Sequence, residues 1–322
     1  MLPPISVAGE RSADRAWQLT LAAAGASERL AQAGQAAAFA WADDAGELRT
    51  VPAGHPAAVL DWQPAEGWQP CLPSRDPAGA LLDLYLPICS ATARQPIVVG
   101  HLGQSLDGFI AMHTGESQFV TGPENILHLH RMRALSDVVI VGAGTVATDN
   151  PQLTTRHVTG PNPQRVVFDP SRRLAGEYRI FTDGDAPTVY ACARALVGRG
   201  ETQVGRASIL GLDAGSPGEQ VAELLRALRE RGARRVFVEG GGVTVSAFLE
   251  ANLLDRLHVA IAPLIIGDGR PAIRLPPRAS LGDCARPHCR VFRMGGDVLF
   301  DCDLRAPADA VAADAAGVTR VI

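Results

Sequence analysis

Short hydrophobic runs alternate with helix-like segments from Pro96 onward. Their length and their content of β-branched residues are typical of buried strands. The runs are PIVVGHL (96–102), VVIVG (138–142), RVVF (165–168), PTVYACA (187–193), ASILGL (207–212), RRVFVEG (234–240), LHVAIAPLII (257–266), CRVFRM (289–294) and DVLFDCDL (297–304). Alternating strands and helices predict an α/β fold, and the last two runs, joined by Gly295 and Gly296, are expected to form a hairpin. We therefore expect a mixed, mostly parallel sheet flanked by helices, with an antiparallel C-terminal edge.

The first 95 residues have a different pattern. Residues 13–38 are alanine-rich and predict a helix interrupted at Gly25 and Gly34, whereas residues 46–96 carry Pro, Gly and Trp at short intervals. The expected domains are a small N-terminal domain of unknown role at 1–95, a main domain at 96–305 and a C-terminal tail at 306–322. The tryptophans are expected to fill a small core or an interface rather than to stack on a ligand. They are Trp17, Trp41, Trp62 and Trp68.

Glycine-rich segments follow several of the predicted strands. They are SLDGFIA (105–111), GESQFVTGPE (115–124), VGAGTVATDNPQLTTR (141–156) and VEGGGVTVSAFLE (238–250). A glycine backbone can approach a phosphate closely, and a helix N-terminus offers it free N–H groups. In the VGAGT turn, Gly142 and Gly144 permit this approach and Thr145 offers a hydroxyl. A standard Rossmann fold is disfavoured because Ala147 occupies the third position of GxGxxG.

Capping boxes of the form S/T-x-x-E mark two helix starts. They lie at Thr121–Glu124 and Ser216–Glu219, each with a proline in the first turn. We therefore expect helices to begin after Thr121 and after Ser216.

One charged residue falls on the apolar side of the first of these helices. The stripe is formed by Ile126, Leu129 and Met132. Arg133 points between Ile126 and Leu129, so it needs an anion, since an unpaired buried charge is costly. The anion is either Asp137, four residues on, or a ligand phosphate. His128 and His130 fall off the stripe and are expected at the surface.

Five sets of residues occur in a fixed order between residues 95 and 304. They are SLDG, ESQ with TGPE, the helix end R-x-R-A-x-S-D, VGAGTV with D-N-P-x-L-T-x-R, and VEGGG followed by LLDRLHVAIAPLIIG. Together they resemble the riboflavin-pathway pyrimidine reductase family, the reductase half of bifunctional deaminase/reductases. The resemblance implies a dihydrofolate-reductase-like fold. It also implies an enzyme that uses NADPH to reduce the ribosyl group of a ribosylaminopyrimidine phosphate, such as 5-amino-6-(5-phosphoribosylamino)uracil, to ribityl. The deaminase half is not expected, because HxE paired with PCxxC is missing.

The resemblance also implies which residues form the site. Those expected to contact substrate are Ser117, Arg133, Leu153, Arg156 and Glu239, with Glu239 as the catalytic candidate. Those expected to contact NADPH are Gly103, Phe119, Thr145, Asp149 and the run from Gly241 to Ala247, which includes Gly242, Val243 and Thr244; Gly142 and Gly144 join them. Arginine forks suit a sugar phosphate, and glycines at a helix start suit pyrophosphate. Arg172 or Arg173 either binds the 2′-phosphate of NADPH or belongs to a solvated charge run.

Two positions depart from the family. A lysine usual shortly before SLDG is His101 here, and a basic residue usual just after it is Phe109. We keep His101 as a substrate-binding position. The alternatives are a dihydropterin- or dihydrofolate-type reductase of the same fold and a non-catalytic nucleotide-binding subunit. Asp107 is expected to cap its own loop rather than to donate a proton.

Composition limits the partners. The chain has 322 residues, 47% of them hydrophobic and 20% charged, with a net charge of −4. This balance argues against nucleic acid and membrane as partners and favours a small-molecule substrate. No spanning segment or secretory signal is visible, so a cytoplasmic location is expected. The family commonly pairs reductase domains, which implies a homodimer.

Residue types also exclude some chemistry. All basic side chains are arginine, which excludes a lysine Schiff base and a lysine-containing P-loop. No metal is expected, because Cys284, His288 and Cys289 lack a second ligand pair at usable spacing.

Overall fold

The computed structural model describes residues 7–42, 47–73, 76, 78–118, 120–213 and 215–305. The chain divides into two compact units, 1–96 and 97–322. This division falls one residue from the expected domain boundary. The expected tail at 306–322 lies outside the described residues.

The first unit combines two helices with an antiparallel sheet. Strands β1 (Ala37–Trp41), β2 (Leu48–Val51), β3 (Ala58–Gln63) and β4 (Gly67–Pro70) follow the order β2-β1-β3-β4. Helix α1 (Val7–Ala33) continues through Gly25 and ends before Gly34, whose φ of 63° suits glycine. Residues 37 and 38, expected in the helix, belong to β1. Helix α2 (Gly79–Cys89) completes the unit.

Tryptophans fill the core of this first unit. Trp17 packs edge-on against Tyr85, with ring centroids 6.0 Å apart. The Trp68 indole N–H donates to the Ala23 carbonyl at 3.0 Å and to the Ser27 hydroxyl at 2.9 Å. Trp62 is also buried, whereas Trp41 is half-buried. Three of the four therefore have the expected packing role.

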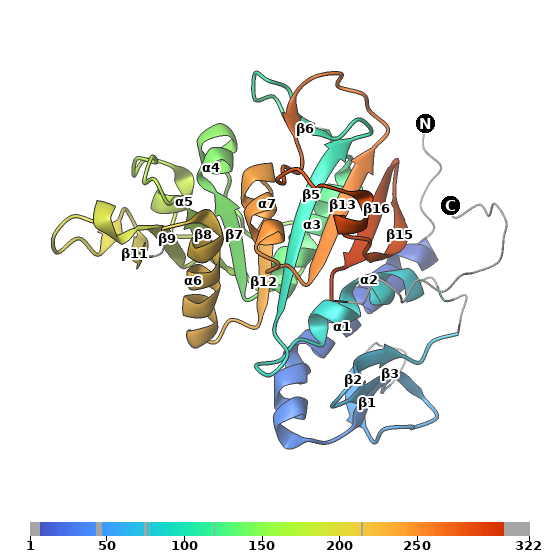
Figure 1. Ribbon diagram of the computed structural model, residues 1–322. Coiled ribbons are helices and arrows are strands. Elements are labelled where there is room, and N and C mark those ends of the chain that lie inside the picture. Colours follow the sequence, from blue (N-terminus) through green and yellow to red (C-terminus); the bar gives the residue numbers. More distant parts are fainter. Residues whose placement is uncertain are drawn as a thin grey trace. The chain divides into compact units, whose positions relative to one another are not determined.

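The second unit is built on one large sheet, shown in Figure 1. Among the described residues, ten strands follow the order β10-β11-β9-β8-β7-β12-β5-β13-β16-β15. Their bounds are β5 (Ile97–Ser105), β7 (Val138–Gly142), β8 (Gln164–Phe168), β9 (Thr188–Ala193), β10 (Gln203–Val204), β11 (Ala207–Leu212), β12 (Arg235–Glu239), β13 (Arg256–Ala262), β15 (His288–Met294) and β16 (Asp297–Asp303). From β11 to β13 all neighbours are parallel, and β16 and β15 form the antiparallel edge. The mixed, mostly parallel sheet and its C-terminal hairpin are confirmed.

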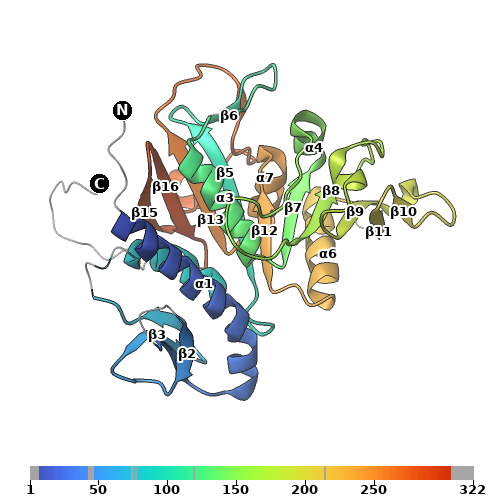
Figure 2. The ribbon, with the colours of Figure 1, turned by 180° about the vertical axis from the view of Figure 1, so that it is seen from behind.

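Helices cover both faces of this sheet. Helices α6 (Pro217–Glu230) and α7 (Gly242–Glu250) lie on the face seen in Figure 1, and α3 (Pro123–Leu135) lies on the face seen in Figure 2. Apolar residues of alternate positions, such as Val98, Val236 and Val238, pack with Leu224 and Phe248 on the first of these faces. The remaining elements are short: α4 (Ala143–Asp149), α5 (Arg179–Thr182), β6 (Phe109–Ala111), β14 (Arg270–Pro271) and the 3₁₀ turns η1 (Arg194–Leu196) and η2 (Leu281–Asp283).

One of the two expected capping boxes is present. Ser216 and Glu219 cap α6 reciprocally, as expected. At α3 the expectation is wrong, because the cap position is Gly122, whose N–H donates to an Asp297 carboxylate oxygen at 2.6 Å. The Thr121 hydroxyl instead accepts a hydrogen bond from Asn125.

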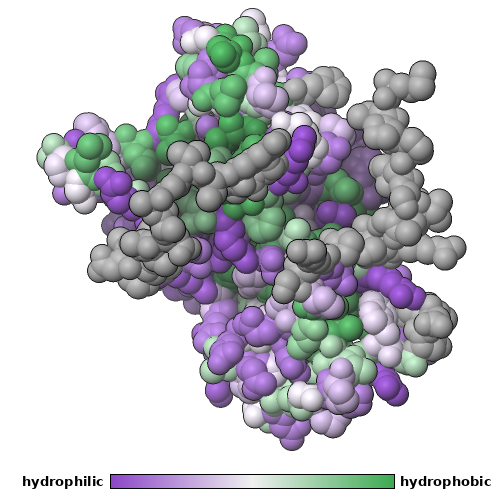
Figure 3. All heavy atoms as spheres, turned by 90° about the vertical axis from the view of Figure 1, so that its right-hand side faces the viewer, coloured by the Kyte–Doolittle hydropathy of each residue, from purple (hydrophilic) through white to green (hydrophobic). Residues whose placement is uncertain are grey.

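The described helices include none with the length and apolar character needed to span a membrane. Some apolar side chains are nevertheless exposed in the second unit. Leu106, Leu264 and Ile265 are exposed on two segments joined by the bond from the Leu106 N–H to the Leu264 carbonyl. Figure 3 shows hydrophobic side chains gathered in its upper part.

Candidate active site

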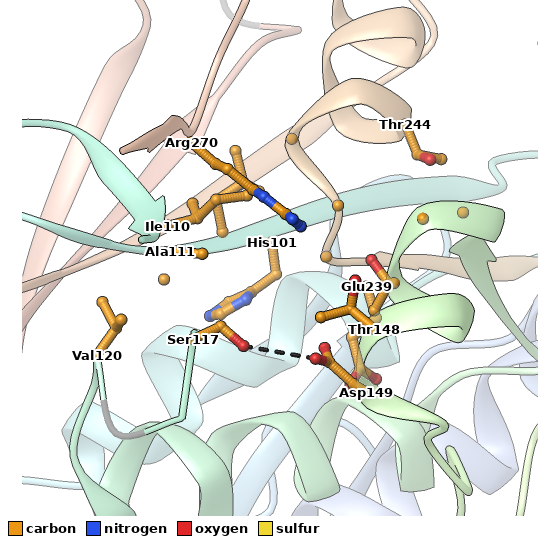
Figure 4. A pocket seen from close by; sticks show the side chains of 18 of the residues that line it. His101, Ile110, Ala111, Ser117, Val120, Thr148, Asp149, Glu239, Thr244 and Arg270 are labelled. Atoms are coloured by element: carbon orange, nitrogen blue, oxygen red, sulfur yellow. Dashed lines mark hydrogen bonds between the residues drawn. The ribbon is translucent and has the colours of Figure 1, made fainter. Parts of the chain in front are cut away.

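A cavity of about 660 Å³ lies where β5, β7 and β12 approach their carboxyl ends. This is the edge at which open α/β sheets bind ligands, and the volume suits an organic ligand. Figure 4 shows side chains from β5, β6, β12, β14, α4 and α7 around it. All lining residues belong to the second unit.

A row of polar residues crosses five adjacent strands on the face covered by α3. The paired positions are Glu239 with His101, His101 with His258, His258 with Asp301, and Asp301 with Arg290. Residues in register point to the same face of a sheet. The first four are buried, and Arg290 at the sheet edge is half-buried. The row begins in the cavity, which Glu239 and His101 line.

Helix α3 supplies a polar partner for three members of this row. Arg133 contacts Glu239, Asn125 contacts His101 at 3.0 Å, and His128 Nε2 lies 3.1 Å from His258 Nδ1. His128 and His130 are 1% and 2% exposed, so their expected surface position is wrong. Ile126, assigned to the buried stripe, is 39% exposed. The helix therefore buries a polar face where the sequence pattern predicted an apolar one.

Arg133 and Glu239 form a buried two-pronged ion pair. Arg133 Nε donates to Glu239 Oε2 at 2.7 Å and Nη2 donates to Oε1, while Nη1 donates to the Thr154 carbonyl at 3.1 Å. Asp137, one of the two anions expected for Arg133, is not its partner, because the Asp137 carboxylate lies at the start of β12. It accepts the backbone N–H groups of Arg234 and Arg235 at 2.8 and 2.9 Å. The other expected anion, a ligand phosphate, stays a prediction.

The far end of the row is held by arginines. Arg256 and Arg290 each place a guanidinium nitrogen 2.7 Å from Asp301 Oδ2, and His258 Nε2 lies 3.3 Å from Oδ1. Burial acts to raise the pKa of Asp301, but the contacts with His258 and Arg256 outweigh it and lower the pKa. Asp301 therefore remains a carboxylate beneath the sheet edge.

Cationic and neutral groups gather next to the ion pair. Arg156 donates its backbone N–H to His130 Nδ1 at 3.0 Å and its guanidinium to the Thr154 hydroxyl at 2.7 Å. Burial and the neighbouring Arg133 and Arg156 lower the pKa of His130 to about 3, so it is neutral. Burial, Arg133 and Arg179 lower the pKa of Arg156. Among the described residues Arg156 has no carboxylate partner within ion-pair distance, which leaves its charge available to an anion.

The two glycine turns pack against each other as well as lining the cavity. A Cβ on Gly142 would lie 2.1 Å from Thr244 Oγ1, and one on Gly241 would lie 2.8 Å from Thr145 Oγ1. A Cβ on Gly242 would lie 2.2 Å from the Ala272 carbonyl. Gly144 differs, because no atom lies within 4 Å of its Cβ position. The first three glycines thus lie where an added Cβ would overlap the facing turn or the Ala272 carbonyl, whereas Gly144 and Gly240, which also line the cavity, leave space for a close approach.

The opposite wall carries a hydroxyl, a carboxylate and an arginine. Ser117 Oγ and Asp149 Oδ1 lie 3.5 Å apart, the contact dashed in Figure 4. Burial raises the pKa of Asp149, although Ser117 and Arg270 act against it. Figure 4 shows the Arg270 guanidinium directed toward the middle of the cavity.

Most residues singled out in the sequence line this one cavity. They are His101, Gly103, Ser117, Arg133, Gly142, Gly144, Thr145, Asp149, Leu153, Glu239, Gly241, Gly242, Val243 and Thr244. Arg156 is not among the lining residues, and Phe119 lies outside the described residues. Arg172 and Arg173 also do not line it; Arg172 pairs with Glu201, and Arg173 lies 3.7 Å from Asp169.

Sequence reasoning missed several lining residues. They are Thr121, Asn125, Thr148, Arg270 and Arg274. Arg270 belongs to the short ribbon of β14 with β6, and a two-residue strand leaves no periodic signal. Asn125 lies eight residues before Arg133 on α3. Helical periodicity places it near the Arg133 side of the helix, and this periodicity is the signal that would have found it.

Asp107 has the structural role expected of it, but its partners are in a second loop. Its carboxylate accepts the Ile266 and Gly267 N–H groups at 3.1 and 2.6 Å and the Ser105 hydroxyl. The Ser105 bond and these N–H groups lower the pKa of Asp107 to about 2. The described residues include no group of three or more His, Cys, Asp or Glu side chains that could hold a metal ion.

A family model described as the RibD C-terminal domain matches residues 96–290. The 2,5-diamino-6-ribosylamino-4(3H)-pyrimidinone 5′-phosphate reductase of Methanothermobacter thermautotrophicus is 33% identical over 213 residues, which cover 64% of this chain and 97% of the relative. The riboflavin biosynthesis protein RibD of Aquifex aeolicus is 31% identical over 179 residues, covering 55% of this chain and 49% of the relative. The chain thus matches nearly all of the first relative and about half of the second.

Among solved structures, the chain is similar to the diaminohydroxyphosphoribosylaminopyrimidine deaminase/5-amino-6-(5-phosphoribosylamino)uracil reductase of Thermotoga maritima. The TM-score is 0.56 at 27% identity, covering 70% of this chain and 61% of that chain. The match spans less than two thirds of the bifunctional protein.

Proposed function

Because the chain belongs to the RibD C-terminal domain family, we propose that it reduces the ribosyl group of a ribosylaminopyrimidine phosphate to ribityl with NADPH. It is then a reductase of riboflavin biosynthesis. One observation carries the proposal: a single cavity is lined both by two glycine turns and by a buried arginine–glutamate pair. The proposal includes no deaminase activity, because neither the second unit nor the family match indicates one.

The glycine-turn side suits a dinucleotide. The N-cap of α7 is Gly241, which has no side chain to cap the helix. The Thr244 N–H donates to the Gly241 carbonyl at 2.9 Å, whereas the Gly242 and Val243 N–H groups have no acceptor among the described residues and are available to a phosphate. Gly144 leaves room for close approach on the facing turn. The cofactor-binding group is then Gly103, Gly142, Gly144, Thr145, Asp149, Gly241, Gly242, Val243 and Thr244. A bound NADPH supplies the hydride, and the residues around it fix the distance to the sugar carbon and exclude water.

The polar side suits the sugar phosphate. The Arg156 guanidinium bonds the Thr154 hydroxyl and has no carboxylate partner among the described residues, whereas Arg133 is committed to Glu239. We assign the phosphate to Arg156, and the sugar or pyrimidine edge to Glu239, Ser117 and His101, with Leu153 packing against it. Glu239 is the catalytic candidate in this scheme, acting as an oriented carboxylate acceptor.

The dihydropterin alternative needs a carboxylic acid able to donate a proton in the cavity. Of the two candidates from the sequence, Glu239 is held by Arg133 and Asp107 does not line the cavity, which leaves Asp149, whose pKa is raised by burial, as the cavity carboxyl that this alternative would use. A homodimer and a cytoplasmic location remain predictions, as does selection of NADPH over NADH. The exposed Leu106, Leu264 and Ile265 are candidates for the dimer contact.

Stopped-flow absorbance at the NADPH band tests the proposal. We expect oxidation with 2,5-diamino-6-ribosylamino-4(3H)-pyrimidinone 5′-phosphate or 5-amino-6-(5-phosphoribosylamino)uracil and none with dihydrofolate. Oxidation with dihydrofolate alone would favour the pterin alternative. Tight NADPH binding without oxidation by any of them would favour a non-catalytic subunit.

A further inference from the structure

We propose that Asn125 is a positioning residue that holds the His101 ring in its Nε2–H tautomer, so that His101 Nδ1 accepts a hydrogen bond from a sugar hydroxyl of the substrate. This inference rests on the proposed function for the identity of the ligand. Its first half, the fixed tautomer, concerns the protein alone.

The hydrogen bonds around Asn125 set the direction of its amide. Asn125 Nδ2 donates to Thr121 Oγ1 at 2.9 Å, so Oδ1 faces the imidazole, 3.0 Å from His101 Nε2. A carbonyl oxygen can only accept, which requires the hydrogen of the neutral ring to be on Nε2. His101 Nδ1 then carries a lone pair and no hydrogen.

That lone pair has no partner within the described part of the protein. His101 is 3% exposed and lines the cavity, and among the described residues its ring makes one hydrogen bond, the one from Nε2. His101 Nδ1 is not one of the described side-chain atoms that are both buried and unpartnered, so it keeps access to the cavity, where an open acceptor can receive a ligand donor. A hydroxyl is the matching neutral donor on a sugar.

The groups around the ring keep it neutral. Arg133 and His128 face it from α3, His258 from β13, and Glu239, engaged by Arg133, from β12. Burial and the neighbouring His258 lower the pKa of His101 to about 3. Across the physiological range the ring therefore offers an acceptor and no positive charge, which suits a hydroxyl better than a phosphate.

The Asn125 side chain that binds the His101 ring is itself held in place by packing. Asn125 is 2% exposed, and a Cβ on Gly103 would lie 2.8 Å from Thr121 Cγ2. Gly103 lies two residues after His101 on β5, so strand and helix meet closely at this point. The ring therefore keeps its orientation before the substrate arrives.

Two substitutions of His101 separate the two edges of the ring. The amide of His101→Asn places an acceptor near the Nδ1 position, whereas His101→Gln reaches the Nε2 position and retains the contact with Asn125. We expect the KM for 2,5-diamino-6-ribosylamino-4(3H)-pyrimidinone 5′-phosphate to rise about 5- to 10-fold in His101→Gln, the range of one lost hydrogen bond, and to rise less in His101→Asn. The Kd for NADPH should be unchanged in both. His113→Gln, at an exposed histidine away from the cavity, is the control.

Nitrogen-15 NMR of the imidazole reads the tautomer without substrate. We expect a single Nε2–H signal for His101 in the wild-type protein and a mixture of tautomers in Asn125→Ala. Asn125→Asp retains an acceptor, so it should keep the Nε2–H form and raise the pH at which the ring titrates. Adding the substrate should shift the Nδ1 resonance of His101 in the wild-type protein. This resonance is absent from the spectrum of His101→Gln.

Two results would overturn the inference. One is an Nδ1–H ring in the wild-type protein, and the other is a KM that rises in His101→Asn but not in His101→Gln. Failure of the wild-type protein to oxidise NADPH with this substrate is a different result. It would refute the proposed function and the hydroxyl ligand, while the tautomer comparison would still decide the role of Asn125.

Discussion

The ion pair between Arg133 and Glu239 determines the charge of the cavity floor. Both side chains are about nine-tenths buried, and the Arg133 guanidinium donates two hydrogen bonds to the Glu239 carboxylate. Such a pair loses hydration when it forms and is compensated only while both partners are present. Each residue therefore fixes the other, and the Glu239 side chain that lines the cavity has a set orientation.

Replacing one partner should reveal this dependence. In Arg133→Met the Glu239 carboxylate remains buried without a cation, so we expect the free energy of unfolding to fall by about 3–5 kcal/mol. Urea denaturation followed by circular dichroism measures the change.

The double variant Arg133→Met/Glu239→Gln is the matched control. It removes the stranded charge, so most of the lost stability should return. Arg194→Met breaks an exposed pair with Asp213 and should change stability little. A single variant Arg133→Met as stable as the wild-type protein would contradict the interdependence of the pair.

The burial of Arg133 was predictable from the sequence, but its partner was not. Helical periodicity places the residue on the inner side, and a buried cation requires an anion. Glu239 is 106 residues away along the chain. Only the parallel pairing of β12 between β7 and β5 brings it under α3, and local spacing favoured Asp137 instead.

At the level of elements, α3 shows where hydrophobic patterning fails. Its inner face carries Asn125, His128 and Arg133 because it covers a polar row of the sheet. A pattern that equates burial with apolar residues places the helix in the wrong rotation, which explains the exposed Ile126. The strands, in contrast, were predictable, since their cores are apolar on both faces or on one.

The glycine turns combine two requirements that the sequence cannot separate. Gly142, Gly241 and Gly242 allow α4 and α7 to pack, whereas Gly144 has free space on its cavity side. Gly144 therefore provides a clean test of where the cofactor lies, because an added methyl group meets no protein atom.

We expect Gly144→Ala to weaken NADPH binding without loss of stability. Gly144 lies within α4, where alanine is favoured over glycine by up to about 1 kcal/mol, so the unfolding transition should stay or rise. Isothermal titration calorimetry gives the NADPH affinity, and thermal unfolding gives the stability.

For Gly142→Ala we expect the main effect on stability rather than on NADPH affinity. Its methyl group would overlap Thr244 Oγ1, so we expect lower stability, by about 1–3 kcal/mol, with any loss of affinity following from it. Unchanged NADPH affinity in Gly144→Ala would remove this turn from the dinucleotide path.

At the level of the whole molecule, the sequence predicts some parts of the fold and not others. The sheet and its edge hairpin follow from strand length, composition and the glycine pair before β16. The cavity wall formed by Arg270 and Arg274 does not, since it depends on how the segment after β13 returns to β6. The short strands of the first unit likewise lack a distinctive pattern, as the four-residue strands β2 (LRTV) and β4 (GWQP) show.

The distribution of tryptophan makes the two units separately observable in the intact chain. All four tryptophans lie in residues 1–96, and all cavity-lining residues lie beyond Pro96. Tryptophan fluorescence therefore reports unfolding of the first unit, while far-ultraviolet circular dichroism reports both. A ligand that binds only the folded second unit stabilises it by RT ln(1 + [L]/Kd), about 2.7 kcal/mol at a hundredfold excess over Kd.

If the units unfold independently, NADPH should raise the circular-dichroism transition and leave the fluorescence transition where it is. The signal needs correction for absorption by NADPH, which is why the transition temperature rather than the intensity is compared. The Gly144→Ala variant serves as the control, because weaker binding should reduce the shift seen by circular dichroism. A fluorescence transition that moves together with the other would mean that the two units unfold as one cooperative body, and that the first contributes to the stability of the site.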